Sequence, residues 1–230
     1  MKSISSRFVS VRFTVLVLLF VLLTPGIVFS QASVSKQVLE SSQKALADYI
    51  THFIRKDNLK SFGFESIEGS RAARLGNPYP VMIIGLRDLT EYKAGTSTRL
   101  LLIDSKTLWF PVNVEGRPRT KLEMVEKEGK WIPGEFGGTK TVEPVTMGLN
   151  QLPKLMESKG IHPPYRIMLV KIPALYATFL YREGPEGEFL IPTMVQPERF
   201  DLMNSQIYNS EEVLSKLREY AKRIDPDKVM

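Results

Sequence analysis

A period-two pattern of apolar and polar side chains runs through the middle of the chain. At residues 108–114 the apolar residues at even positions alternate with Trp109 and two other residues at odd positions. Successive side chains of a strand point to opposite faces, so the pattern predicts a strand with one face on a core. A Glu-Gly pair follows at residues 115–116 and again at 128–129, and glycine supplies the positive φ that tight hairpins need. We therefore predict a three-stranded antiparallel meander within residues 107–138.

Helical periodicity appears in three other places. Residues 34–55 carry an apolar stripe opposite a polar one, which predicts an amphipathic helix packed on another element. Residues 152–158 predict a short helix with Pro153 in its first turn. Residues 211–224 predict a terminal helix capped by Ser210.

Further apolar runs predict the remaining strands, which are residues 81–86, 98–104, 165–172, 174–182 and 188–195. Runs of strands without intervening helices indicate an α+β fold, in which antiparallel β-meanders pack with amphipathic helices in the order α-β(n)-α-β(3)-α. The glycine-rich stretch at residues 137–148 divides the chain into two similar halves, residues 31–142 and 143–230, which either form two domains or combine into one. The helix followed by a meander is similar in outline to cystatin-like exported modules, and such an outline does not fix a function.

The first thirty residues have the three parts of a secretory signal peptide. Lys2, Arg7 and Arg12 precede an apolar run, and small residues follow at Ser30 and Ala32. We expect cleavage after one of these two residues and export to the periplasm or the extracellular space. The alternative is an uncleaved membrane anchor, although the apolar run is short for a membrane span.

Export changes the meaning of the charge. The chain has a net charge of +6, but removal of the leader leaves 28 basic residues against 25 acidic ones, a net charge of +3. This weak excess does not indicate nucleic acid as a partner. The chain has no cysteine, so disulfides, thiol catalysis and a lipidated N-terminal cysteine are excluded.

Few catalytic chemistries fit the sequence. The two histidines, His52 and His162, lack metal-motif spacing, and the chain contains neither a nucleophile elbow nor a phosphate-binding loop. We therefore predict no catalytic residues, no metal site and no cofactor.

Carboxylates give the alternative to a binding function. Glu123, Glu126, Glu128 and Glu135 lie close together in the predicted hairpins. Paired carboxylates catalyse hydrolysis when burial separates their pKa values, so a carboxylate-based hydrolase of an envelope polymer is the second hypothesis. Basic residues alternate with these acids, a pattern typical of a solvated strand face.

Aromatic and basic residues alternate in the same hairpins and supply the candidate ligand-binding residues, Trp109, Arg117, Arg119 and Trp131. Tryptophan faces contact sugar rings or apolar side chains, and the competing interpretation places each tryptophan in the core or at its rim. We predict an exported protein that acts by binding an envelope protein, a peptide or a glycan, with no membrane span once the leader is removed.

Overall fold

The computed structural model describes residues 34–158, 160 and 166–224. The predicted leader and His162 lie outside these residues.

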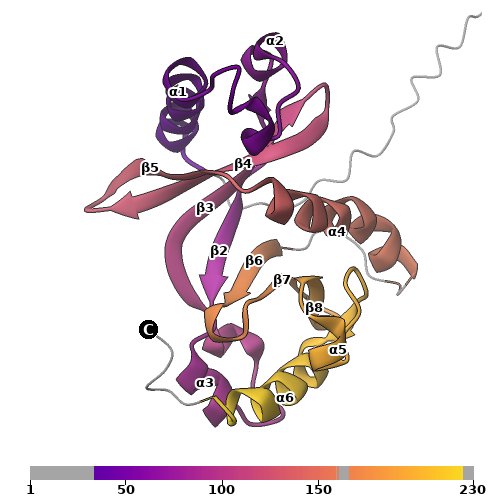
Figure 1. The fold of residues 1–230 in the computed structure, drawn as a ribbon. Helices are drawn as coiled ribbons and strands as arrows, with labels where there is room; N and C mark the ends of the chain where they lie inside the picture. Colours follow the sequence, from indigo (N-terminus) through magenta and orange to yellow (C-terminus); the bar gives the residue numbers. More distant parts are fainter. Residues whose placement is uncertain (1–33, 159, 161–165, 225–230) are drawn as a thin grey trace, which may run out of the picture.

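One mixed sheet of nine strands organises the protein (Figure 1). The strands are β1 (Arg74–Leu75), β2 (Tyr79–Ile83), β3 (Ile103–Val114), β4 (Arg117–Lys127), β5 (Lys130–Gly137), β6 (Arg166–Ile172), β7 (Ala177–Gly184), β8 (Gly187–Met194) and β9 (Tyr208–Asn209). Their order is β5-β4-β3-β2-β6-β7-β8-β9, and β1 pairs with β3 beside β2. The strands β2 and β6 are parallel, whereas the other described pairs are antiparallel. The predicted α+β class with antiparallel meanders is thus confirmed, and one parallel pair joins the meanders.

Helices cover both faces of this sheet. The α-helices are α1 (Lys36–His52), α2 (Ile67–Arg71), α3 (Leu86–Glu91), α4 (Thr139–Ser158), α5 (Pro197–Phe200) and α6 (Ser210–Ala221). Three short 3₁₀ helices are η1 (Leu59–Phe62), η2 (Thr98–Leu101) and η3 (Pro173–Leu175). The predicted strand at residues 98–104 is wrong in its first part, because these residues form η2 before β3 begins.

The alternation in β3 assigns its side chains to two cores. Leu108, Phe110 and Val112 pack with residues of α1 on one face of the sheet, which we call the α1 face. Trp109 points to the opposite face, where it packs with residues of α4 such as Val142, and we call this the α4 face. The predicted separation of the two side-chain sets is confirmed.

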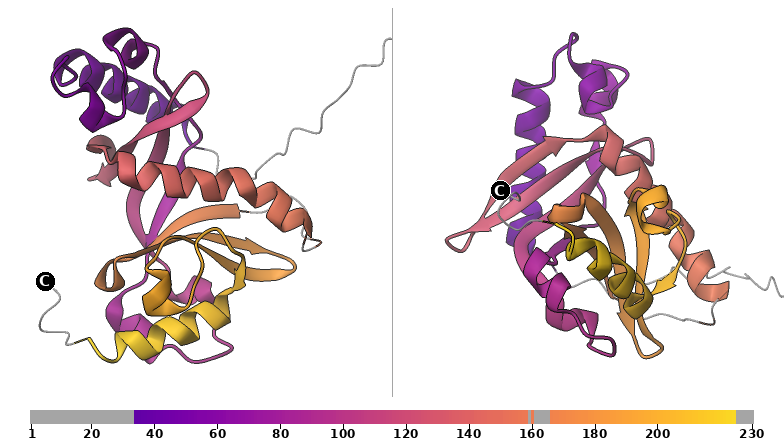
Figure 2. Two further views of the ribbon diagram at one scale, coloured as in Figure 1. Left: turned by 45° about the vertical axis from the view of Figure 1, so that its right-hand side comes forward. Right: turned by 60° about the horizontal axis from the view of Figure 1, so that its bottom comes forward.

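The second half of the sheet is also covered on both faces. Met168, Val170 and Phe179 pack with residues of α3 and α6 on the α1 face. On the α4 face, α4 crosses the sheet from β4 to β8 (Figures 1 and 2). The protein therefore has three layers, with the sheet in the middle.

The largest correction concerns α4. We predicted a helix only at residues 152–158, but α4 begins at Thr139 and includes both Pro144 and Pro153. Its packing explains why these prolines are tolerated, since Val145, Leu152 and Met156 are buried against the sheet and tertiary packing supplies most helical stability in proteins. The predicted division between residues 142 and 143 falls inside this helix.

Smaller features of the prediction are refined at turns and caps. Glu115 and Gly116 both have positive φ, as do Glu128 and Gly129, and this is the geometry of the predicted two-residue hairpins. The cap of α6 is Asn209 rather than Ser210, because the Asn209 side chain accepts a hydrogen bond from the backbone N–H of Glu211. Within the described residues, no helix has the length and apolar character needed to cross a membrane.

Candidate ligand-binding groove

Two adjacent hollows lie between α4 and the β3–β4 hairpin. The first has a volume of about 430 Å³ and includes Arg117 and Arg119 in its wall. The second has a volume of about 300 Å³. They share Pro118, Thr146 and Asn150, so together they form one elongated concave surface, which we call the α4 groove. Its size falls in the range of roughly 300–1,000 Å³ that is typical of ligand sites.

Three cationic side chains lie at alternate positions of β4, from the groove towards the start of α4. They belong to Arg117, Arg119 and Lys121. Arg119 pairs with Glu65, with 2.9 Å between its Nη2 and the carboxylate. Lys121 pairs with Glu123 and Glu135. Arg117 makes no ion pair with any residue that the structure describes, and its side chain is exposed. This arrangement therefore leaves one guanidinium group of the groove available to an anion.

Beside the arginines, the groove is lined by three side-chain amides, by the carboxylate of Glu143 and by apolar residues such as Met147 and Leu149. Asn77 and Asn113 belong to the second hollow, and Asn150 belongs to both. None of these amides makes a hydrogen bond to another side chain or backbone group of the described chain. Since an amide both donates and accepts hydrogen bonds, they are suited to a polar ligand.

Glycine is required where the backbone enters the second hollow. Gly76 donates a backbone hydrogen bond to the Pro111 carbonyl at 2.7 Å. A Cβ atom at this position would lie only 2.7 Å from Pro111 Cγ and 2.9 Å from Asn113 Nδ2. A side chain would therefore displace the wall of the groove.

Thr146 lies at the floor of the groove on the sheet side of α4. The residue is 9% exposed, and its buried hydroxyl finds no hydrogen-bond partner in the described structure. A buried hydroxyl without a partner is uncommon, because its desolvation costs free energy. The floor of the groove thus has unused hydrogen-bonding capacity.

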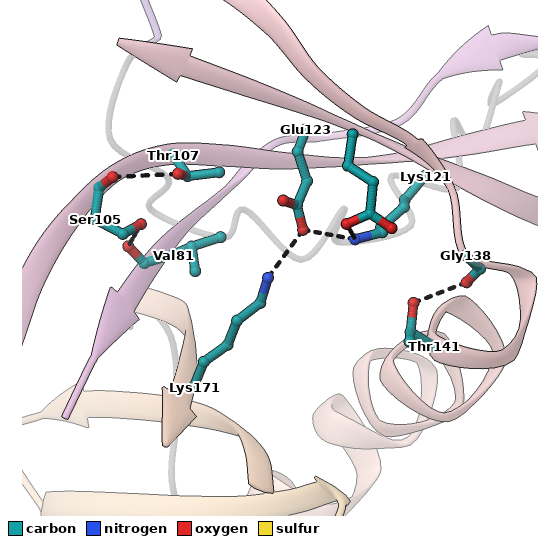
Figure 3. Close-up of polar contacts among 9 residues, drawn as sticks. Val81, Ser105, Thr107, Lys121, Glu123, Gly138, Thr141 and Lys171 are labelled. Carbon is teal, nitrogen blue, oxygen red and sulfur yellow. Dashed lines mark hydrogen bonds and ion pairs between the residues drawn. The ribbon is translucent and has the colours of Figure 1, made fainter. Parts of the chain in front are cut away.

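An ion cluster lies beside the start of α4, close to Gly138 (Figure 3). Lys121 Nζ is 2.7 Å from Glu123 Oε1 and 2.7 Å from Glu135 Oε2. Lys171 Nζ, from β6, is 2.9 Å from the same Glu123 oxygen. The Lys121 and Glu123 side chains are only 5% and 11% exposed, whereas those of Lys171 and Glu135 are 33% and 58% exposed. The cluster therefore joins the two halves of the sheet through a pair of buried charges with more exposed partners.

The cluster sets the protonation state of Glu123. Burial raises the pKa of this carboxyl group, but the hydrogen bonds and positive charges of Lys121 and Lys171 outweigh it, and the pKa lies below its ordinary value. A general acid needs a raised pKa in order to hold its proton near neutral pH. Glu123 is therefore held in its ionised form and does not have the raised pKa that a general acid requires.

The two tryptophans have different surroundings from those of the arginines. Trp109 is 2% exposed beneath α4, with its ring centroid 6.1 Å from that of Tyr79, so its ring is not available to a ligand. Trp131 is partly buried and packs on the core of the α1 face. The structure therefore brings Arg117 and Arg119 together in the groove and places both tryptophans elsewhere.

Metal-ligating side chains do not gather in the part of the chain that the structure describes, where no group of three or more histidine, aspartate or glutamate residues could hold an ion. His52 lies exposed at the end of α1.

Sequence reasoning missed the residues that come to the groove from distant segments. Asn77 precedes β2, Thr146 lies in the stretch of α4 that was interpreted as a boundary between two halves, and Asn150 lies just before the predicted short helix. These two residues were missed because no helix was predicted there. A helix over this segment places Thr146 and Asn150 one turn apart on the same side.

Comparison of the chain with protein-family models, curated proteins and solved structures finds no match.

Proposed function

We propose that the protein is an exported binding protein and that its α4 groove holds an acidic, extended peptide segment of an envelope partner. Arg117 carries this proposal, because it is an exposed guanidinium group at the groove with no carboxylate partner among the described residues. Guanidinium groups form paired hydrogen bonds with carboxylates. The leader pattern supports export, and the groove supports binding.

The amides of the groove favour a peptide. Asn77, Asn113 and Asn150 can donate to peptide carbonyls and accept from peptide N–H groups at the same time. A glycan site usually adds an aromatic ring as a platform for the sugar. The aromatic residue of the groove, Tyr79, is only 9% exposed, so a peptide fits the described walls better than a glycan does.

The test starts from an unbiased selection. A random peptide library is selected on the purified protein, and the dissociation constant of the best peptide is measured by fluorescence anisotropy. We expect the selected peptides to contain Asp or Glu. A twin peptide with these residues changed to Asn or Gln should bind much more weakly.

Two variants locate the site. A hydrogen bond to a charged group contributes about 1.5–3 kcal/mol, so Arg117→Gln should weaken binding roughly ten- to hundredfold. Arg55→Gln is the matched control, because Arg55 is also exposed without an ion pair to any described residue and lies outside the groove. Neutral selected peptides, or equal binding by both variants, would contradict the proposal. Arg117-dependent binding of an acidic oligosaccharide in place of peptides would support the glycan alternative.

A further inference from the structure

A second concave site lies on the opposite face of the molecule from the α4 groove. It is a pocket of about 490 Å³ between α1, the end of α2 and β1, which we call the α1 pocket. Leu46 and Ala73 are buried at its floor. Ile50 and Leu75 contribute further aliphatic surface. The floor is therefore aliphatic, unlike the amide-lined α4 groove.

Two arginines stand at the α1 pocket. Arg71 and Arg74 both line it, and neither makes an ion pair with another described residue. Arg74 Nη1 donates to the carbonyls of Ala73 at 2.8 Å and of Arg71 at 3.3 Å. These bonds hold the Arg74 guanidinium in place, while most of its five N–H donors stay available. Among the described residues, no carboxylate side chain belongs to the wall.

One flank of α1 continues beyond the pocket, and it is apolar except for Gln43. Leu39, which is 38% exposed, lies on the same flank as Gln43, Ala47 and Ile50, because positions four or about eleven residues apart share one side of a helix. From residue 39 to residue 50 this flank extends roughly 16 Å, at about 1.5 Å per residue. An extended alkyl chain can follow such a flank.

We propose that the α1 pocket binds a single-chain amphiphile with an anionic head group, such as a fatty acid. The alkyl chain lies on the aliphatic floor and along α1, and the carboxylate is bound by Arg71 and Arg74. Burial of the chain is favourable because it removes apolar surface from water, and the head group receives charge-assisted hydrogen bonds.

The charges around the pocket favour a single bound ligand over a membrane surface as the partner of this face. The exposed side of α1 alternates in sign through Lys36, Glu40, Lys44 and Asp48. Binding to an anionic bilayer requires a basic cluster, which this helix does not present. A confined ligand with one anionic group matches a pair of arginines better than a lipid surface does.

Isothermal titration calorimetry with dodecanoate, below its micellar concentration, tests the proposal. We expect one saturable site. Dodecyltrimethylammonium has the same chain with the opposite charge, and it should bind at least tenfold more weakly. The double variant Arg71→Gln/Arg74→Gln should also weaken dodecanoate binding at least tenfold.

Ala47→Phe fills the pocket from an exposed position on α1, so it should abolish binding without unfolding the protein, which a thermal melt checks. Lys44→Gln is the matched control on the same helix, and we expect less than a twofold change. Arg117→Gln should leave dodecanoate binding unchanged, which separates this site from the α4 groove.

Three results would overturn the proposal. The first is absent or non-saturating dodecanoate binding, and the second is binding that Ala47→Phe does not reduce. The third is flotation of the protein with phosphatidylglycerol vesicles in the absence of dodecanoate binding, which would assign this face to a membrane.

Discussion

Replacing Trp109 with alanine tests the central claim of the fold, that α4 seals the face of the sheet opposite α1. Trp109 is 2% exposed and packs with Tyr79, Val81 and Val142. The α4 layer is the reason that this ring is in the core, so the stability cost of the substitution measures how well the layer is packed.

The expected magnitude follows from the buried area. An aromatic core residue removes roughly 150–250 Å² from water, which at about 25 cal/mol per Å² corresponds to about 4–6 kcal/mol. The alanine side chain retains a part of this buried apolar area, so we expect Trp109→Ala to lower the free energy of unfolding by about 3–5 kcal/mol. For a protein of this size each kcal/mol lowers Tm by about 2–4 °C, so the melting temperature should fall by roughly 6–20 °C.

Urea unfolding followed by circular dichroism measures the effect, because the signal does not depend on tryptophan. Trp131→Ala is the matched control: its ring is only partly buried, so the expected loss is about 1–2 kcal/mol. Arg117→Ala, at the exposed groove, should change stability by less than about 0.5 kcal/mol. If Trp109→Ala lost no more stability than Trp131→Ala, the inference that α4 forms a sealed layer would be refuted.

Three further substitutions test local features. Glu123→Gln removes the carboxylate that Lys121 and Lys171 share, while Lys121 keeps Glu135 as a partner, so at pH 7 it should cost about 1–3 kcal/mol. The folded-state pKa of Glu123 is lowered, so the stability that its ionised form contributes is present above the ordinary pKa of 4.5 and is lost as pH falls through the folded value. The difference in unfolding free energy between wild type and variant, measured by urea unfolding, should therefore shrink in acid. A difference that stays constant with pH would contradict this. Thr146→Val removes a buried hydroxyl that has no partner in the described structure, so a thermal melt should show unchanged stability or a gain of about 1 kcal/mol, whereas a clear loss would indicate a hydrogen bond to that hydroxyl. Glu128→Asn places a residue suited to left-handed geometry at a φ of 53°, and it should stabilise the hairpin by up to about 1 kcal/mol, which the same melt would detect; a lower Tm would count against strain at this turn.

Local patterns predicted the meander well. The alternation around Trp109 assigned its two faces before the covering helices were known, because strand geometry alone separates even from odd positions. The same local reasoning failed for the first part of α4, where Pro144 and Gly148 resemble the residues of a loop. Packing against the sheet overrides these low intrinsic propensities, and Gly148 lies close to the sheet, where an added Cβ would meet Leu180 at 3.1 Å.

The residues of the candidate sites also differ in whether the sequence alone can identify them. Arg117 and Arg119 could be selected from the sequence because they follow a predicted turn. The burial of Glu123 could not, since its neighbours in sequence suggest a solvated strand face, and Lys171 is 48 residues away along the chain. Contacts between segments so far apart leave no local pattern, so the ion cluster appears only in three dimensions.

The parallel pairing of β2 with β6 has a consequence for folding order. Val81 pairs with Leu169, so 88 positions separate the two partners at the junction of the sheet, and closing such a loop has an entropic cost that slows non-local pairing. During synthesis, residues 79–137 can form the first meander while β2 still lacks its second neighbour. An unpaired edge strand is a template for association with other chains. The interval before residues 166–172 arrive is therefore the period in which a nascent chain is most exposed to aggregation, and substitutions in β6 should reduce the yield of folded protein more than equally buried substitutions in β4 do.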